Sequence, residues 1–133
     1  MTTGVEYFQN IRATDEQRDD SWAPIERNSD RVPEVTPQWV ANNAAALRVI
    51  DVREPDEFRG ELGHVEGAEN VPLREVPESA QSWQRDTPIA VICRSGGRSG
   101  RAALALEEQG FGRVVSMKGG MLEWQKLGLP VVS

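Results

Sequence analysis

The sequence predicts an α/β fold in which a parallel sheet carries helices on both faces. From residue 32 onward, short apolar runs rich in β-branched residues alternate with stretches of good helix formers, which is the pattern of repeated strand–helix units. The length of 133 residues fits one domain. Residues 1–31 are polar and lack a periodic apolar pattern. We therefore expect an N-terminal polar extension over residues 1–31 and one domain over residues 32–133.

The first elements of this domain follow from caps and apolar runs. Thr36 and the proline after it provide the N-cap and the first-turn proline of a helix. Residues 48–52 form an apolar run that predicts a buried strand. Pro55 begins a short helical turn, and residues 77–84 predict another helix.

The second half of the domain carries the clearest strand–helix unit. Residues 88–92 are uncharged and predict a buried strand, and residues 102–107 have high helix propensity. Gly110 is placed to end that helix. A strand at residues 114–115 and a short helix after the glycine pair 119–120 complete the alternation.

Composition excludes several function classes. The chain has 15 Lys and Arg against 21 Asp and Glu, a net charge of −6, which disfavours binding to nucleic acid or to an anionic membrane. It lacks both a signal-like apolar run near its start and the roughly 18 apolar residues of a membrane span. One cysteine and one histidine make neither an internal disulfide nor a four-ligand Cys/His zinc site. We expect a cytoplasmic protein with no metal, no cofactor, and no nucleic-acid or membrane partner.

The single cysteine, Cys93, directly follows a predicted buried strand, and open parallel sheets bind ligands at the carboxyl ends of their strands. Gly96 and Gly97 give the next loop the freedom to turn successive N–H groups toward the sulfur. The start of a helix, together with Arg94 and Arg98, adds positive potential. Each of these effects lowers a thiol pKa from about 8.5. We predict a nucleophilic thiolate for anionic substrates; the alternative is a small structural cysteine.

Loop length separates the reaction classes that use such a thiolate. Cysteine phosphatases place an arginine after five intervening residues, whereas here Arg98 comes after four and Ser99 occupies the next position. The smaller ring of N–H donors suits a single sulfur atom better than a phosphoryl group with several oxygens.

Four stretches of the chain resemble, in the same order, the motifs of the rhodanese family of sulfurtransferases. They are residues 49–58, residues 63–68 with 70–73, residues 93–99, and residues 117–121 with Trp124 and residues 128–131. The resemblance implies a rhodanese-like fold with a central parallel five-stranded sheet and helices on both faces. It also implies a six-residue active-site loop, which matches the length from Cys93 to Arg98.

The hypothesis is therefore sulfur transfer through a persulfide on Cys93. The thiolate takes the outer sulfur of thiosulfate or a related persulfide donor and passes it to cyanide or to a thiol acceptor, which includes a protein thiol. Asp51 and Arg53 lie at the end of a neighbouring predicted strand, and Asp51 is predicted to brace a loop arginine, with plain strand-end structure as the alternative. The residues expected to hold the substrate and the persulfide are Arg94, Ser95, Gly96, Gly97 and Arg98.

Two other function classes stay open. A non-catalytic interaction module would use the same fold to bind a partner, with the N-terminal extension as its docking element. A cysteine phosphatase or arsenate reductase would use the same thiolate on a tetrahedral oxyanion, and the short loop argues against it.

Overall fold

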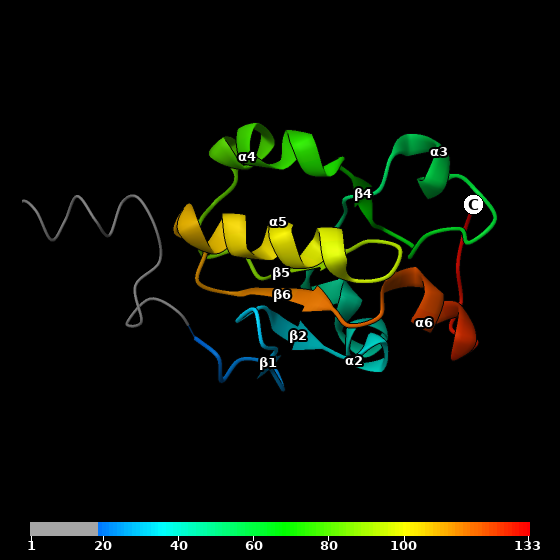
Figure 1. Ribbon diagram of the computed structural model, residues 1–133, viewed down its shortest axis with the longest axis horizontal. Coiled ribbons are helices and arrows are strands. Elements are labelled where there is room, and N and C mark those ends of the chain that lie inside the picture. The colour runs from blue at the N-terminus through cyan, green and yellow to red at the C-terminus, as the bar shows by residue number, and fades with distance from the viewer. Residues whose placement is uncertain (1–18) are drawn as a thin grey trace, which may run out of the picture.

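The computed structural model describes residues 19–133, and its centre is a six-stranded sheet (Figure 1). The strands are β1 Glu26–Arg27, β2 Pro33–Val35, β3 Arg48–Asp51, β4 Glu69–Asn70, β5 Ile89–Ile92 and β6 Val114–Met117. Their order across the sheet is β1-β2-β6-β5-β3-β4. Five strands are mutually parallel, as the sequence led us to expect, and β1 adds a sixth that runs antiparallel to β2.

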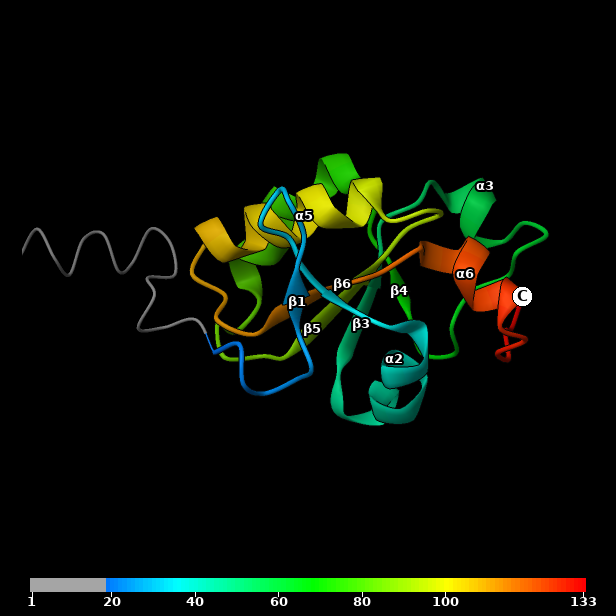
Figure 2. The same ribbon diagram turned by 60° about the horizontal axis from the view of Figure 1, so that its bottom comes forward.

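Helices cover both faces of this sheet (Figures 1 and 2). They are α2 Pro37–Asn43, α3 Pro55–Phe58, α4 Val76–Ser79, α5 Gly97–Glu108 and α6 Gly120–Lys126. Helices α4 and α5 pack on one face, whereas α2 and α6 pack on the other. Among residues 19–133, no helix has the length and apolar character needed to cross a bilayer.

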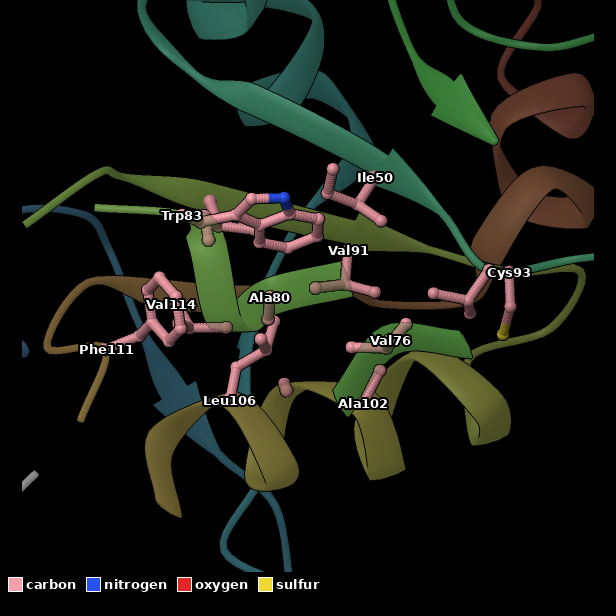
Figure 3. Close-up of a cluster of buried hydrophobic side chains, with 13 residues drawn as sticks. Ile50, Val76, Ala80, Trp83, Val91, Cys93, Ala102, Leu106, Phe111 and Val114 are labelled. Carbon is pink, nitrogen blue, oxygen red and sulfur yellow. The ribbon is translucent and has the colours of Figure 1, made fainter. Parts of the chain in front are cut away.

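Strand β5 lies at the centre of the sheet and is buried along its whole length. Its side chains alternate between the two faces, as they must in a strand. Ile89 and Val91 join the cluster under α5, and Ala90 and Ile92 join the cluster under α2 and α6. The same alternation sends Cys93 to the α5 face, where it ends the row of core side chains beside the first turn of that helix (Figure 3).

The predicted caps form as expected. Thr36 Oγ1 accepts a hydrogen bond from the Trp39 N–H at 3.2 Å and begins α2. Gly110 follows the end of α5 with φ of 100°, the left-handed conformation that ends many helices. The predicted helix over 77–84 is shorter than expected, because α4 gives way at Ala80 to a 3-10 turn. Serines compete with helical hydrogen bonding, and Ser82 Oγ donates to the Ser79 carbonyl at this point.

The sequence analysis assigned residues 1–31 to an extension, and the structure describes the last thirteen of them. Residues 19–31 lie against the domain: they contain β1, and the Trp22 ring meets the Trp39 ring edge-on with centroids 5.6 Å apart. Apolar side chains spaced without period carry this packing, which is why no core pattern predicted it. The rest of the predicted extension lies outside the described residues.

Candidate active site

Cys93 lies directly after β5, at the carboxyl end of the central strand. The Gly96 N–H donates to its sulfur with N and Sγ 3.0 Å apart. This close approach needs Gly96 in the left-handed region, at φ of 112°, where a side chain would be strained. The sulfur also sits at the N-terminus of α5, a helix of twelve residues, whose dipole favours negative charge there.

Two buried serines continue the site beneath the sulfur. Ser99 Oγ lies 3.4 Å from Cys93 Sγ and 2.7 Å from Ser116 Oγ on β6. The Ser99 hydroxyl also donates to the Gly96 carbonyl at 3.1 Å. The sequence analysis used Ser99 only to measure loop length and passed over Ser116. A lone polar residue in the apolar run 114–117 was the available signal.

Opposing effects set the pKa of the Cys93 thiol. Burial raises that pKa, because it penalises the charged form. Hydrogen bonds from the Ser99 side chain and from the backbone of Ser99, Gly96 and Ser95 lower it. The hydrogen bonds outweigh burial, so the pKa lies below its ordinary value and the thiolate is favoured.

Arg98, at the end of the loop, is held by α3. Its two terminal nitrogens donate to the two carboxylate oxygens of Glu57 at 2.8 and 2.9 Å. Glu57 is itself fixed, since its Oε2 accepts the Glu54 N–H at 3.0 Å in a capping box. The hydrogen bonds from Arg98 lower the pKa of Glu57 to about 2. The sequence analysis missed Glu57, which lies 41 residues before its partner.

Asp51 and Arg53 pair with each other. Arg53 donates to both carboxylate oxygens of Asp51, with the shortest contact at 2.8 Å, and both side chains are buried. The remaining Arg53 hydrogens reach the carbonyls of Glu57 and Gly63. The prediction that Asp51 braces a loop arginine is therefore wrong. Arg53 lies only two residues away and occupies Asp51, which leaves Arg98 to Glu57.

His64 belongs to the turn before β4. Its Nδ1 lies 2.9 Å from the Phe58 carbonyl oxygen, and its ring stacks on Phe58 with centroids 3.7 Å apart. Its backbone bridges to Val132. These contacts give His64 a structural role.

The start of α6 packs against the backbone of Cys93 and Arg94. The Met121 and Leu122 N–H groups donate to the carbonyls of Cys93 and Arg94 at 2.9 and 3.0 Å. A side chain at Gly120 would place its Cβ 2.4 Å from the Arg94 carbonyl oxygen. The glycine thus allows α6 to hold the backbone of Cys93 and Arg94.

Beside the loop lies a cleft of about 450 Å³. Arg94, whose side chain is exposed, contributes to its wall from the active-site loop. Asp56, Glu57 and Glu61 line the same cleft, and Leu122 adds an apolar surface. The loop therefore offers the cleft a guanidinium at Arg94, while Arg98 is bound to Glu57.

In this α/β protein a cysteine follows the central parallel strand and begins a six-residue, glycine-containing loop that leads into a helix, at the sheet edge where such folds bind ligands. The family model of the rhodanese-like domain matches residues 36–127. The chain belongs to this family.

Relatives agree with this assignment. The Bacillus subtilis protein YqhL is 40% identical over 77 residues, which cover 58% of this chain and 60% of that protein. A sulfurtransferase of Allochromatium vinosum is 34% identical over 85 residues, covering 64% of this chain and 78% of the relative. The chain thus spans about 60% of the length of the first of these relatives.

A solved structure supports the fold. The rhodanese-related protein of Thermoplasma volcanium superposes with a TM-score of 0.67 at 34% identity, over 74% of this chain and 96% of that one. The fold predicted from the sequence is confirmed, with six strands in place of five.

Proposed function

We propose that this protein is a sulfurtransferase that carries a sulfane sulfur on Cys93. The observation that carries the proposal is the contact of the Gly96 N–H and the Ser99 hydroxyl with the one sulfur of the six-residue loop. Membership of the rhodanese-like family and the similarity to the sulfurtransferase of Allochromatium vinosum support it. The partners we propose are a small anionic sulfur donor and a cyanide or thiol acceptor, including a protein thiol, in the cytoplasm.

The reaction has two displacements. In the first, the Cys93 thiolate attacks the outer sulfur of thiosulfate. A new S–S bond forms, the bond from that sulfur to the sulfonate breaks, and sulfite leaves with the electron pair. In the second, the acceptor's nucleophile attacks the outer sulfur of the persulfide, and the Cys93 thiolate leaves. Cysteine is thus restored without any outside oxidant or reductant.

The loop stabilises the charge in both steps. The amides of Ser95 and Gly96 face the sulfur and offer fixed donors to a persulfide anion. Arg94 draws the anionic donor into the cleft. We assign Arg98 to holding the loop rather than to binding substrate, because Glu57 occupies its guanidinium. Gly97, the first residue of α5, leaves open space above the loop, since a Cβ added there would meet nothing within 4 Å.

Burial of the sulfur favours a sulfane donor over a phosphate ester. Cys93 is only 1% exposed, so a substrate must present a narrow reacting atom. A terminal sulfur is such an atom, whereas a phosphoryl group brings three oxygens that need their own donors. Together with the loop that is one residue shorter, this argues against phosphatase or arsenate reductase chemistry.

The test is direct loading of the cysteine. The protein is incubated with thiosulfate, and in parallel with a small persulfide, and its intact mass is measured; cyanide is then added and thiocyanate assayed. We expect one added sulfur per chain, its removal by cyanide, and neither event in Cys93→Ser. Arg94→Gln should raise KM for thiosulfate several-fold with little change in kcat. A chain that gains no sulfur from either donor would overturn the proposal and favour a non-catalytic interaction module.

A further inference from the structure

Ser116 on β6 has a fully buried hydroxyl that is linked to Cys93 by way of Ser99. Its Oγ lies 2.7 Å from Ser99 Oγ, and Ser99 in turn lies 3.4 Å from Cys93 Sγ. Both serines have no exposed surface. Ser116 is held beside the site by the register of the sheet, in which it pairs with Val91 of β5.

Counting hydroxyl hydrogens assigns the direction of this contact. Each serine has one hydrogen to donate. Among residues 19–133, the hydrogen-bond partner of the Ser116 hydroxyl is Ser99. If Ser99 donated to Ser116, the hydrogen of Ser116 would be left without an acceptor in a buried site, which is costly. Ser116 is therefore the donor and Ser99 the acceptor.

This assignment frees the hydrogen of Ser99 for either of two acceptors. When Cys93 is a thiol, its S–H donates to Ser99 Oγ, and Ser99 donates to the Gly96 carbonyl at 3.1 Å. When the thiol loses its proton to solvent, the Ser99 hydroxyl turns and donates to the sulfur. Ser116 donates to Ser99 in both states, and a hydroxyl that accepts one hydrogen bond is a stronger donor in the next.

We infer that Ser116 is a positioning residue for the Cys93 thiolate: its hydroxyl orients and polarises that of Ser99, which stabilises the anionic sulfur. The effect of Ser116 on the rate of sulfur transfer rests on the proposed function, since the thiolate is the nucleophile of that reaction. Its effect on the thiol itself is independent of any substrate.

Replacing Ser116 leaves the charged groups of the surrounding elements unchanged. These groups are Asp51 on β3 and Arg53 after it, Glu57 on α3, Arg94 and Arg98 in the active-site loop, Lys118 after β6, and Glu123 on α6. The charge of Arg98 interacts with that of Cys93, and Arg98 lies outside the serine pair.

The test is the pH dependence of alkylation of Cys93 by iodoacetamide, measured in the full chain. In Ser116→Ala we expect the midpoint to rise by about half a pH unit to one unit, the size expected from one weakened hydrogen bond to a charge. Ser99→Ala should raise it further. In Ser99→Ala with Ser116→Ala the midpoint should equal that of Ser99→Ala alone, because Ser116 acts only through Ser99.

Two further variants separate this role from a structural one. Val115→Ala, on the same strand, should lower thermal stability and leave the midpoint unchanged. Ser116→Thr keeps the hydroxyl and should return the midpoint toward that of the unchanged protein. An unchanged midpoint in Ser116→Ala, or a shift of equal size with and without Ser99, would overturn the inference. If Ser116→Ala shifts the midpoint but neither thiosulfate nor the small persulfide loads the cysteine, the proposed function fails and this inference stands.

Discussion

Glu57 and Arg98 close the active-site loop from outside, with two parallel hydrogen bonds of 2.8 and 2.9 Å between helix α3 and the first turn of α5. Bidentate pairs of this kind fix orientation as well as add energy. The second arginine of the loop is thus committed to the protein, and the cleft receives the charge of the first.

The Glu57–Arg98 ion pair makes the stability of the protein depend on pH in the acidic range. The pKa of Glu57 falls from 4.5 to about 2 on folding. The contribution of the ionised Glu57 carboxylate to the free energy of unfolding is therefore complete above about pH 4.5 and is lost as the pH drops toward 2. We expect the free energy of unfolding, measured in urea, to fall more steeply over this window in the unchanged protein than in Glu57→Gln. Parallel curves for the two proteins would contradict the assignment. Glu78→Gln, on the exposed surface, serves as the control.

The burial of Cys93 predicts selection of thiol reagents by size. With 1% of the residue exposed, iodoacetamide should label the folded protein, whereas a bulky aromatic disulfide should react at least tenfold more slowly relative to its rate with the unfolded chain. The chain has a single cysteine, so intact mass reports this site alone. Equal protection factors for the two reagents would show that the loop does not restrict access.

Substitution of Gly120 tests the contact between α6 and the backbone of Cys93 and Arg94. Gly120→Ala puts a Cβ 2.4 Å from the Arg94 carbonyl oxygen at φ of 61°, whereas Gly67→Ala has a similar positive φ and open space. The second change should cost roughly 1 kcal/mol of backbone strain, and the first about 2–3 kcal/mol more through overpacking. Urea denaturation measures both. We also expect Gly120→Ala to alter the alkylation rate of Cys93, while Gly67→Ala leaves it unchanged.

The Asp51–Arg53 pair predicts a large penalty for removing one partner. Asp51→Asn leaves the Arg53 charge buried at 1% exposure and should cost about 3 kcal/mol or more in unfolding free energy. Arg74→Gln breaks an exposed pair, in which the Arg74 and Glu54 side chains are 64% and 44% exposed, and it should change the free energy of unfolding far less than Asp51→Asn. Similar costs for the two variants would mean that the buried pair is not a distinct anchor.

The sequence predicted what local pattern encodes. The buried strand before Cys93, the two glycines after it and the helix that follows are contiguous, so periodicity, conformational freedom and propensity all point to one arrangement. The partners of the loop come from elsewhere. Glu57 reaches Arg98 across 41 residues, and only the packing of α3 decides that Arg98 meets this carboxylate.

The error at Asp51 has the same origin. A carboxylate at a strand end has several arginines within reach, and sequence order does not rank them. Arg53 pairs with Asp51 because the turn after β3 brings its guanidinium back over that carboxylate, while the carbonyls of Glu57 and Gly63 accept its other hydrogens. Ser116 was passed over for a different reason. Its position beside Ser99 follows from strand register, which a single sequence does not specify.

The two edge strands of the sheet, β1 and β4, are each two residues long. Such short edge strands present few unpaired backbone N–H and C=O groups to another chain. Strand β5, which is apolar and buried along its whole length, is thereby kept three strands away from one edge and two from the other, which shields a segment of high β propensity from self-association.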